Sequence, residues 1–223
     1  MVSPTIVHSF SVTYDMAYAE ALKIPWDQEK GKKAYATFQR RFKRYWKKSD
    51  EKRVLKWVAR VNGLKWKKES IPIYYVNHLT YGGISDPLTI LIHTKYMPVN
   101  RETLIHELTH RLYSQHFPNK IKKLNRHLEK IYPNEDWGTT HHIPVNMTTL
   151  LVYQKVFGKR DYEHLLPVVA TRKRIRRANE IMYELLPAMK GNVVRYLFSL
   201  NRKKVNELHQ QARNKPNPFR ETK

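Results

Sequence analysis

The stretch Asn100-Arg-Glu-Thr-Leu-Ile-His-Glu-Leu-Thr-His-Arg-Leu-Tyr-Ser-Gln-His116 carries two histidines four residues apart, with a glutamate directly after the first. On an α-helix, residues four apart lie about 40° apart around the axis, so His106 and His110 project from one face. Two imidazoles placed in this way can bind one metal ion. Glu107 beside them can take a proton from water and deliver it to a leaving amine. The HExxH motif therefore predicts a metal-dependent hydrolytic site.

The residues around the motif indicate that it lies on a helix with one buried side. Because the chain contains 11 histidines among 223 residues, only about 0.03 accidental matches to the motif are expected. Asn100 is a predicted N-cap. An apolar stripe would pack against a core, and it consists of Leu104, Ile105, Leu108 and Leu112. The alternative is a buried helix whose histidines are incidental.

The composition is strongly basic and contains no cysteine. There are 42 Lys and Arg against 19 Asp and Glu, which gives a formal net charge of +23. Such a balance favours anionic partners, either nucleic acid or an acidic membrane surface. The absence of cysteine excludes disulfides, a cysteine nucleophile and a zinc site built on thiolates. Any zinc site must therefore use His, Asp or Glu side chains.

The chain is long enough for one well-buried domain with a smaller appended region. Its first 14 residues lack a basic segment followed by a long apolar run, and no later stretch approaches the ~18 continuous apolar residues of a membrane span. We expect a soluble, cytoplasmic protein without a transmembrane segment.

The hydrophobic pattern predicts an α+β fold, mostly helical, with a small antiparallel sheet next to the HExxH helix. Strands are expected at 5–14, 71–76 and 88–93, with a turn at 81–83 before the last of them. Helices are expected at 16–22, 27–48, 49–62, 100–116, 119–131, 142–157 and beyond residue 161. Four regions follow: a basic helical region at 1–70, a catalytic core at 71–158, a second basic helical region at 159–213, and a disordered tail at 214–223.

The helix predicted at 27–48 is both aromatic and basic. Its aromatic residues Tyr35, Phe38, Phe42 and Tyr45 recur at helical spacing, and Lys and Arg occupy the other faces. The charged faces can be a solvated surface over a core-forming helix, or they can contact the phosphates of a nucleic acid. The sequence leaves both interpretations open.

A catalytic zinc site needs a third protein ligand in addition to His106 and His110. His142 is the first candidate, because Asn146 stands one turn later and could hydrogen-bond a metal-binding imidazole. His116 is the second, although on an uninterrupted helix it would point about 80° away from His106. The remaining candidates are His141 and a carboxylate, Glu129 or Asp136.

The motif resembles that of the zincin metallopeptidases over about residues 71–157. A ligand on a later helix, with a polar residue four positions on, resembles the gluzincins, although His142 stands where that family usually has Glu. The spacing from His106 to His116 resembles that of the metzincins and of the SprT-like and WLM proteases of DNA–protein crosslink repair. Here Tyr113-Ser114-Gln115 contains no helix breaker, which those families generally have.

The resemblance implies hydrolysis of peptide bonds with bound Zn²⁺. Glu107 would be the general base and then the general acid, and Tyr153 is a candidate oxyanion donor. The basic helices suggest substrates associated with DNA or RNA. The opposing hypothesis is a non-enzymatic, basic nucleic-acid-binding protein in which the HExxH helix is structural.

Overall fold

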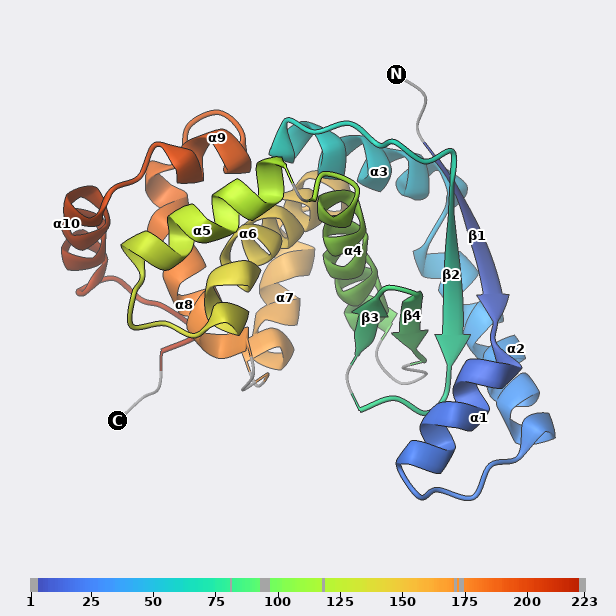
Figure 1. Cartoon of the computed structure of the whole chain (residues 1–223). Coiled ribbons are helices and arrows are strands. Elements are labelled where there is room, and N and C mark those ends of the chain that lie inside the picture. Colours follow the sequence, from blue (N-terminus) through green and yellow to red (C-terminus); the bar gives the residue numbers. More distant parts are fainter. Residues whose placement is uncertain are drawn as a thin grey trace. The chain divides into compact units, whose positions relative to one another are not determined.

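The computed structural model describes residues 4–80, 82–92, 97–117, 119–170, 172 and 175–220, and Figure 1 labels its elements. The chain divides into two compact units. The first consists of Met1–Lys56 and Trp66–Arg111, and the second of Trp57–Lys65 and Leu112–Lys223. These units do not coincide with the region boundaries expected at residues 70 and 158.

The first unit contains a four-stranded mixed sheet with the order β1-β2-β4-β3. Its strands are β1 (Thr5–Phe10), β2 (Ser70–Val76), β3 (Gly83–Ser85) and β4 (Leu88–Leu91). β1 pairs parallel with β2, and β2 pairs parallel with β4, whereas β3 pairs antiparallel with β4. The mostly helical α+β prediction is confirmed, but the expected antiparallel sheet is wrong. Three helices separate β1 from β2, which is enough chain for a parallel crossover.

Two of these crossover helices are α1 (Val12–Ala21) and α2 (Gln28–Tyr45), and the third, α3 (Lys48–Asn62), ends in the second unit. The aromatic face of α2 packs on the sheet, since the rings of Phe38 and Phe42 lie 5.0 and 6.2 Å from that of Tyr75 on β2. Both phenylalanines are buried, while the basic residues of α2 are exposed. The predicted aromatic core side is confirmed for Phe38 and Phe42, whereas Tyr45 at the end of the helix is exposed.

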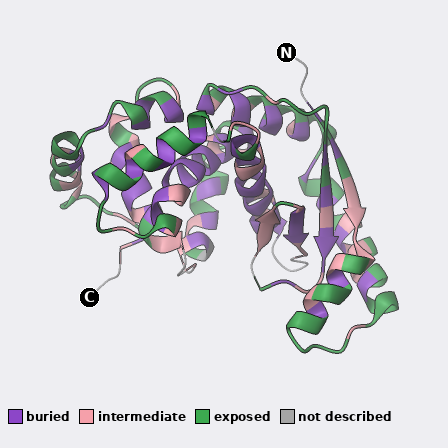
Figure 2. Ribbon diagram, viewed as in Figure 1, coloured by how far each residue is buried: buried purple, intermediate pink, exposed green. Residues whose placement is uncertain are grey.

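The HExxH motif lies on α4 (Met97–Ser114), whose length is largely buried in Figure 2. The helix begins at Met97, so Asn100 is a buried helical residue and the predicted N-cap is wrong. Pro98 in the first turn is compatible with this earlier start, because that position needs no backbone N–H. The strand expected at 88–93 ends at Leu91, and His93 lies outside the described residues.

The second unit is helical in its described part. α6 (Trp137–Phe157) is its most buried helix, and other helices pack on it. α6 begins five residues before His142, because Asp136 caps it by accepting from the amide of Thr139 at 2.8 Å. Gly158 follows its last residue, and its φ of 101° suits glycine. The other helices are α5 (Lys120–Ile131), α7 (Lys159–Ala170), α8 (Arg176–Leu185), α9 (Val193–Phe198) and α10 (Arg202–Ala212), with a 3₁₀ turn at Leu186–Ala188.

The segment after α10 folds back onto the second unit. Phe219 is only 1% exposed, and Arg220 donates to the carboxylate of Glu184. The residues up to 220 therefore do not form the free tail expected at 214–223, and residues 221–223 lie outside the described part. In that described part, none of the helices combines the length and apolar character needed to cross a membrane.

Candidate metal centre

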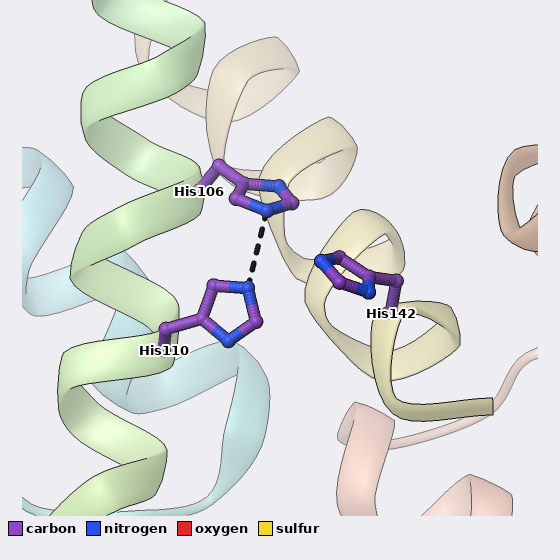
Figure 3. A group of neighbouring side chains, drawn as sticks. All are labelled: His106, His110 and His142. Carbon is purple, nitrogen blue, oxygen red and sulfur yellow. Dashed lines mark hydrogen bonds between the residues drawn. The ribbon is translucent and has the colours of Figure 1, made fainter. Parts of the chain in front are cut away.

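The two histidines of the motif lie together on α4. Their Nε2 atoms, joined by the dashed line in Figure 3, are 3.1 Å apart. His106 is 7% exposed. In a tetrahedral zinc site with Zn–N bonds of 2.0–2.1 Å, two ligand nitrogens are separated by about 3.3 Å. The spacing of the pair therefore fits two ligands of one ion.

Glu107 lies on the same helix and contacts the edge of the sheet. A β-carbon built on Gly83 of β3 would meet Glu107 Cγ at 2.7 Å and its Oε1 at 3.0 Å. Glu107 is 7% exposed. The carboxylate is thus held against a strand backbone that can come so close only because residue 83 lacks a side chain.

The β3–β4 hairpin is also tied to α4 by an ion pair. Arg111, next to His110, contacts Asp86 in the hairpin turn with 2.7 Å between Nη1 and Oδ1. The turn expected at 81–83 is partly a strand, since β3 begins at Gly83, and Tyr81 lies outside the described residues. β3 also occupies the sheet edge, whereas the strand at 88–91 lies inside the sheet.

His142 is in the first half of α6. Its Nδ1 donates to the carbonyl of Gly138 at 2.6 Å, so in the neutral imidazole the proton is on Nδ1 and Nε2 carries the lone pair. His106, His110 and His142 form a group that could hold a metal ion, each offering a ligand atom within 4.8 Å of the others (Figure 3). Since His142 belongs to the second unit, its role as third ligand is part of the proposal below.

The other histidines considered as ligands have different surroundings. His116 follows the end of α4, and its Nε2 donates to the carbonyl of Lys65 at 2.8 Å. His141 is stacked on Trp137 and has its Nδ1 3.1 Å from the side-chain amide of Asn125. Burial, and then the neighbouring His142, lower the pKa of His141 to about 4. Neither residue belongs to the group that could hold a metal ion.

The two candidate carboxylates are also outside this group. Asp136 is engaged as the cap of α6, where its two oxygens accept from the amide and the hydroxyl of Thr139 at 2.8 Å. Glu129 is exposed on α5.

Two supporting roles predicted on α6 are wrong. Asn146 donates to the side chain of Asn179 on α8 at 2.7 Å, so the acceptor that orients His142 is the Gly138 carbonyl. Tyr153, the candidate oxyanion donor, is 0% exposed and packs against Phe157 and Tyr162 in the core of the second unit. A hydroxyl buried there has no access to a substrate.

A buried polar network joins the end of α4 to α6 within the second unit. The side-chain oxygen of Asn62 accepts from Tyr113 Oη at 2.6 Å and from Thr148 Oγ1 at 2.9 Å. Burial raises the pKa of Tyr113 far above its ordinary value of 10.0, so its hydroxyl is a permanent donor. Tyr113 is three residues after His110, and Thr148 is six residues after His142.

Three contributions to the site are missed by sequence reasoning: the close approach of Gly83, the ion pair of Arg111 and the carbonyl of Gly138. The sequence signals only the close approach of Gly83, through the adjacent glycines 82 and 83, because glycines in or beside a strand often mark a close backbone contact.

Comparison of the chain with protein-family models, with curated proteins and with solved structures finds no match.

Proposed function

We propose that this protein is a zinc-dependent peptidase. The observation that carries the proposal is the 3.1 Å separation of the His106 and His110 ring nitrogens on α4. Glu107, the residue after His106, is held at the sheet edge. Imidazole ligands without any thiolate are typical of catalytic zinc sites. Bound there, zinc would act as a Lewis acid on the substrate carbonyl and make water easier to deprotonate.

His142 is proposed as the third ligand. The Gly138 carbonyl orders its ring and leaves Nε2 as the coordinating nitrogen, an arrangement common in metal-binding histidines. The Asn62 network supports this assignment from within the second unit, since it holds the last turn of α4 against α6 close in sequence to both histidines.

Glu107 is proposed as the proton carrier. Its carboxylate would accept a proton from the attacking water and then donate it to the leaving amine, so that the nitrogen departs as a neutral group. Contact with the backbone of β3 limits where the carboxylate can lie, which keeps it beside the histidines rather than in solvent. A general base of this kind contributes about 10²–10⁴-fold to a rate.

The substrate is proposed to be an extended peptide. β3 is an edge strand of the described sheet, and its outer backbone groups can pair with an added strand. Because β3 is also the strand that contacts Glu107, a peptide paired with β3 would lie one strand away from this carboxylate. We further propose that the substrates include proteins associated with nucleic acid, because a net charge of +23 concentrates polyanions around the protein.

The test is cleavage of a denatured protein by zinc-loaded wild type and by Glu107→Gln, read by mass spectrometry of new termini. The wild type should generate peptides, and the variant should retain zinc but cleave at least about 100-fold more slowly. Equal activity in the two proteins would exclude Glu107 as the base. The absence of cleavage by zinc-loaded wild type on a broad mixture of unfolded proteins would favour the non-enzymatic alternative.

A further inference from the structure

We propose that the outward face of α2 is a docking surface for the phosphate backbone of a nucleic acid. The surface consists of Lys33, Arg40 and Arg44, which are all exposed. At about 100° per residue, the three side chains project within about 40° of one another on the helix. They form one straight row about 16 Å long, at a rise of 1.5 Å per residue.

This row lies opposite the side of α2 that is buried. Phe38 and Phe42 project about 140° and 180° from Lys33 around the helix axis, and both pack against Tyr75 of the sheet. The sheet contacts therefore fix the direction of the row. Side chains on a helix anchored in this way are presented together to a partner.

Few carboxylates lie near the row. Asp27, directly before α2, interacts electrostatically with Lys33 but forms its ion pair with Lys30. From Lys30 to Ser49, both included, the sequence has nine Lys or Arg and no Asp or Glu. Lys30 and Lys32 in the first turns of α2 do form ion pairs, with Asp27 and Glu29. Lys48 at the start of α3 pairs with Glu51. Among the ion pairs of the described residues, none involves Lys33, Arg40 or Arg44.

A regular polyanion matches this arrangement. Successive phosphates of one DNA strand advance about 3.4 Å along the duplex, so a row of about 16 Å spans about five nucleotides. An anionic membrane fits less well, because helices that bind membrane surfaces also present apolar side chains to the lipid. The apolar side of α2 is occupied by the sheet. Tyr45 is its only exposed large hydrophobic residue among those described.

The C-terminal end of α2 contacts the HExxH helix within the first unit. Arg101 of α4 donates from Nε to the carbonyl of Tyr45 at 2.6 Å, and its guanidinium lies 5.2 Å from the centre of the Tyr45 ring. Arg101 is five residues before His106. A nucleic acid bound along α2 would be held by the same compact unit that carries the HExxH motif, which deepens the proposed preference for nucleic-acid-associated substrates.

The test compares two variants with the same loss of charge. In the first, Lys33, Arg40 and Arg44 are changed to alanine; in the control, the exposed residues Lys122, Lys123 and Arg126 of α5 are changed to alanine. Binding to labelled duplex DNA and duplex RNA of about 20 base pairs is measured by fluorescence anisotropy over a salt series. Circular dichroism checks folding, and zinc content is recorded separately.

We expect wild-type affinity to fall with salt, and the α2 variant to reduce the slope of log K against log salt by about 2.7, or 0.9 per lost phosphate contact. Over the tenfold range from 1 M to 0.1 M salt, this change in slope corresponds to an affinity of the variant up to about 500-fold lower than that of wild type at 0.1 M. The α5 control should lose much less. The ratio of DNA to RNA affinity identifies the source of the phosphates.

Equal losses in both variants would overturn the proposal, because net charge alone would then account for binding. So would salt-independent binding, or binding to vesicles of phosphatidylcholine and phosphatidylserine without binding to either nucleic acid. These results are independent of the metal site, since apo protein can be assayed in the same way. Failure of the peptidase proposal and failure of this one are therefore distinguishable.

Discussion

Glu107 and Gly83 are in contact so close that a β-carbon on residue 83 would lie 2.7 Å from Glu107 Cγ. The contact brings the proposed proton carrier and the sheet edge together inside one compact unit. It also explains why a glycine is required at the start of a strand, where glycine is otherwise unfavourable.

Replacing Gly83 with alanine should displace the Glu107 side chain. Because the new methyl group would overlap with Cγ and Oε1, we expect peptidase activity to fall at least about 10-fold, while the zinc content is unchanged. Gly82→Ala is the matched control, since a β-carbon there would meet Thr103 only at ordinary contact distances of 3.4 and 3.5 Å. Equal activity of the two variants would show that the position of Glu107 does not depend on the close approach.

The Asn62 network predicts a non-additive effect on stability. Asn62→Leu removes the closer acceptor of the buried Tyr113 hydroxyl and leaves it the Pro144 carbonyl at 3.5 Å, so we expect a loss of about 2–3 kcal/mol in the free energy of unfolding, measured with urea. Adding Tyr113→Phe removes the stranded hydroxyl as well, and the double variant should be more stable than the sum of the two single losses predicts. Strict additivity would mean that the two side chains act independently.

Glu51 predicts a loss of stability in acid. Burial raises the pKa of this carboxyl, but hydrogen bonds from His8 and Lys48 outweigh burial and leave it below its ordinary value of 4.5. A lowered folded-state pKa stabilises the native state above the ordinary pKa, and this contribution disappears as the pH falls through the folded-state value.

The stability difference between wild type and Glu51→Gln should therefore be largest near neutral pH and shrink below about pH 4.5. Urea unfolding at a series of pH values measures it. The exposed Glu20→Gln variant is the control and should differ little from wild type at any pH. A difference between wild type and Glu51→Gln that stays constant into acid would contradict the prediction.

The sequence was sufficient to locate the helices with strong periodicity. α2 shows why: its buried Phe38 and Phe42 and its exposed lysines and arginines alternate with the helical period over five turns. The same geometry indicated that His116 would diverge from the motif, and the structure has it bound to the Lys65 carbonyl.

Strand direction and the detailed surroundings of the site could not be predicted in this way. Alternation of apolar residues is the same in parallel and antiparallel strands, so the pattern of β2 does not reveal its partners. β3 has only three residues, too few for any period. The acceptor for His142 is a backbone carbonyl, which no side-chain pattern encodes.

Zinc content measured by elemental mass spectrometry tests the central claim most directly. Wild type, His142→Ala and the matched control His116→Ala would be purified, reconstituted with zinc, and checked for folding by circular dichroism. We predict about one equivalent of zinc in wild type and in His116→Ala, and loss of zinc from His142→Ala. Zinc retained by folded His142→Ala, or no stoichiometric zinc in the wild type, would contradict the proposed metal centre.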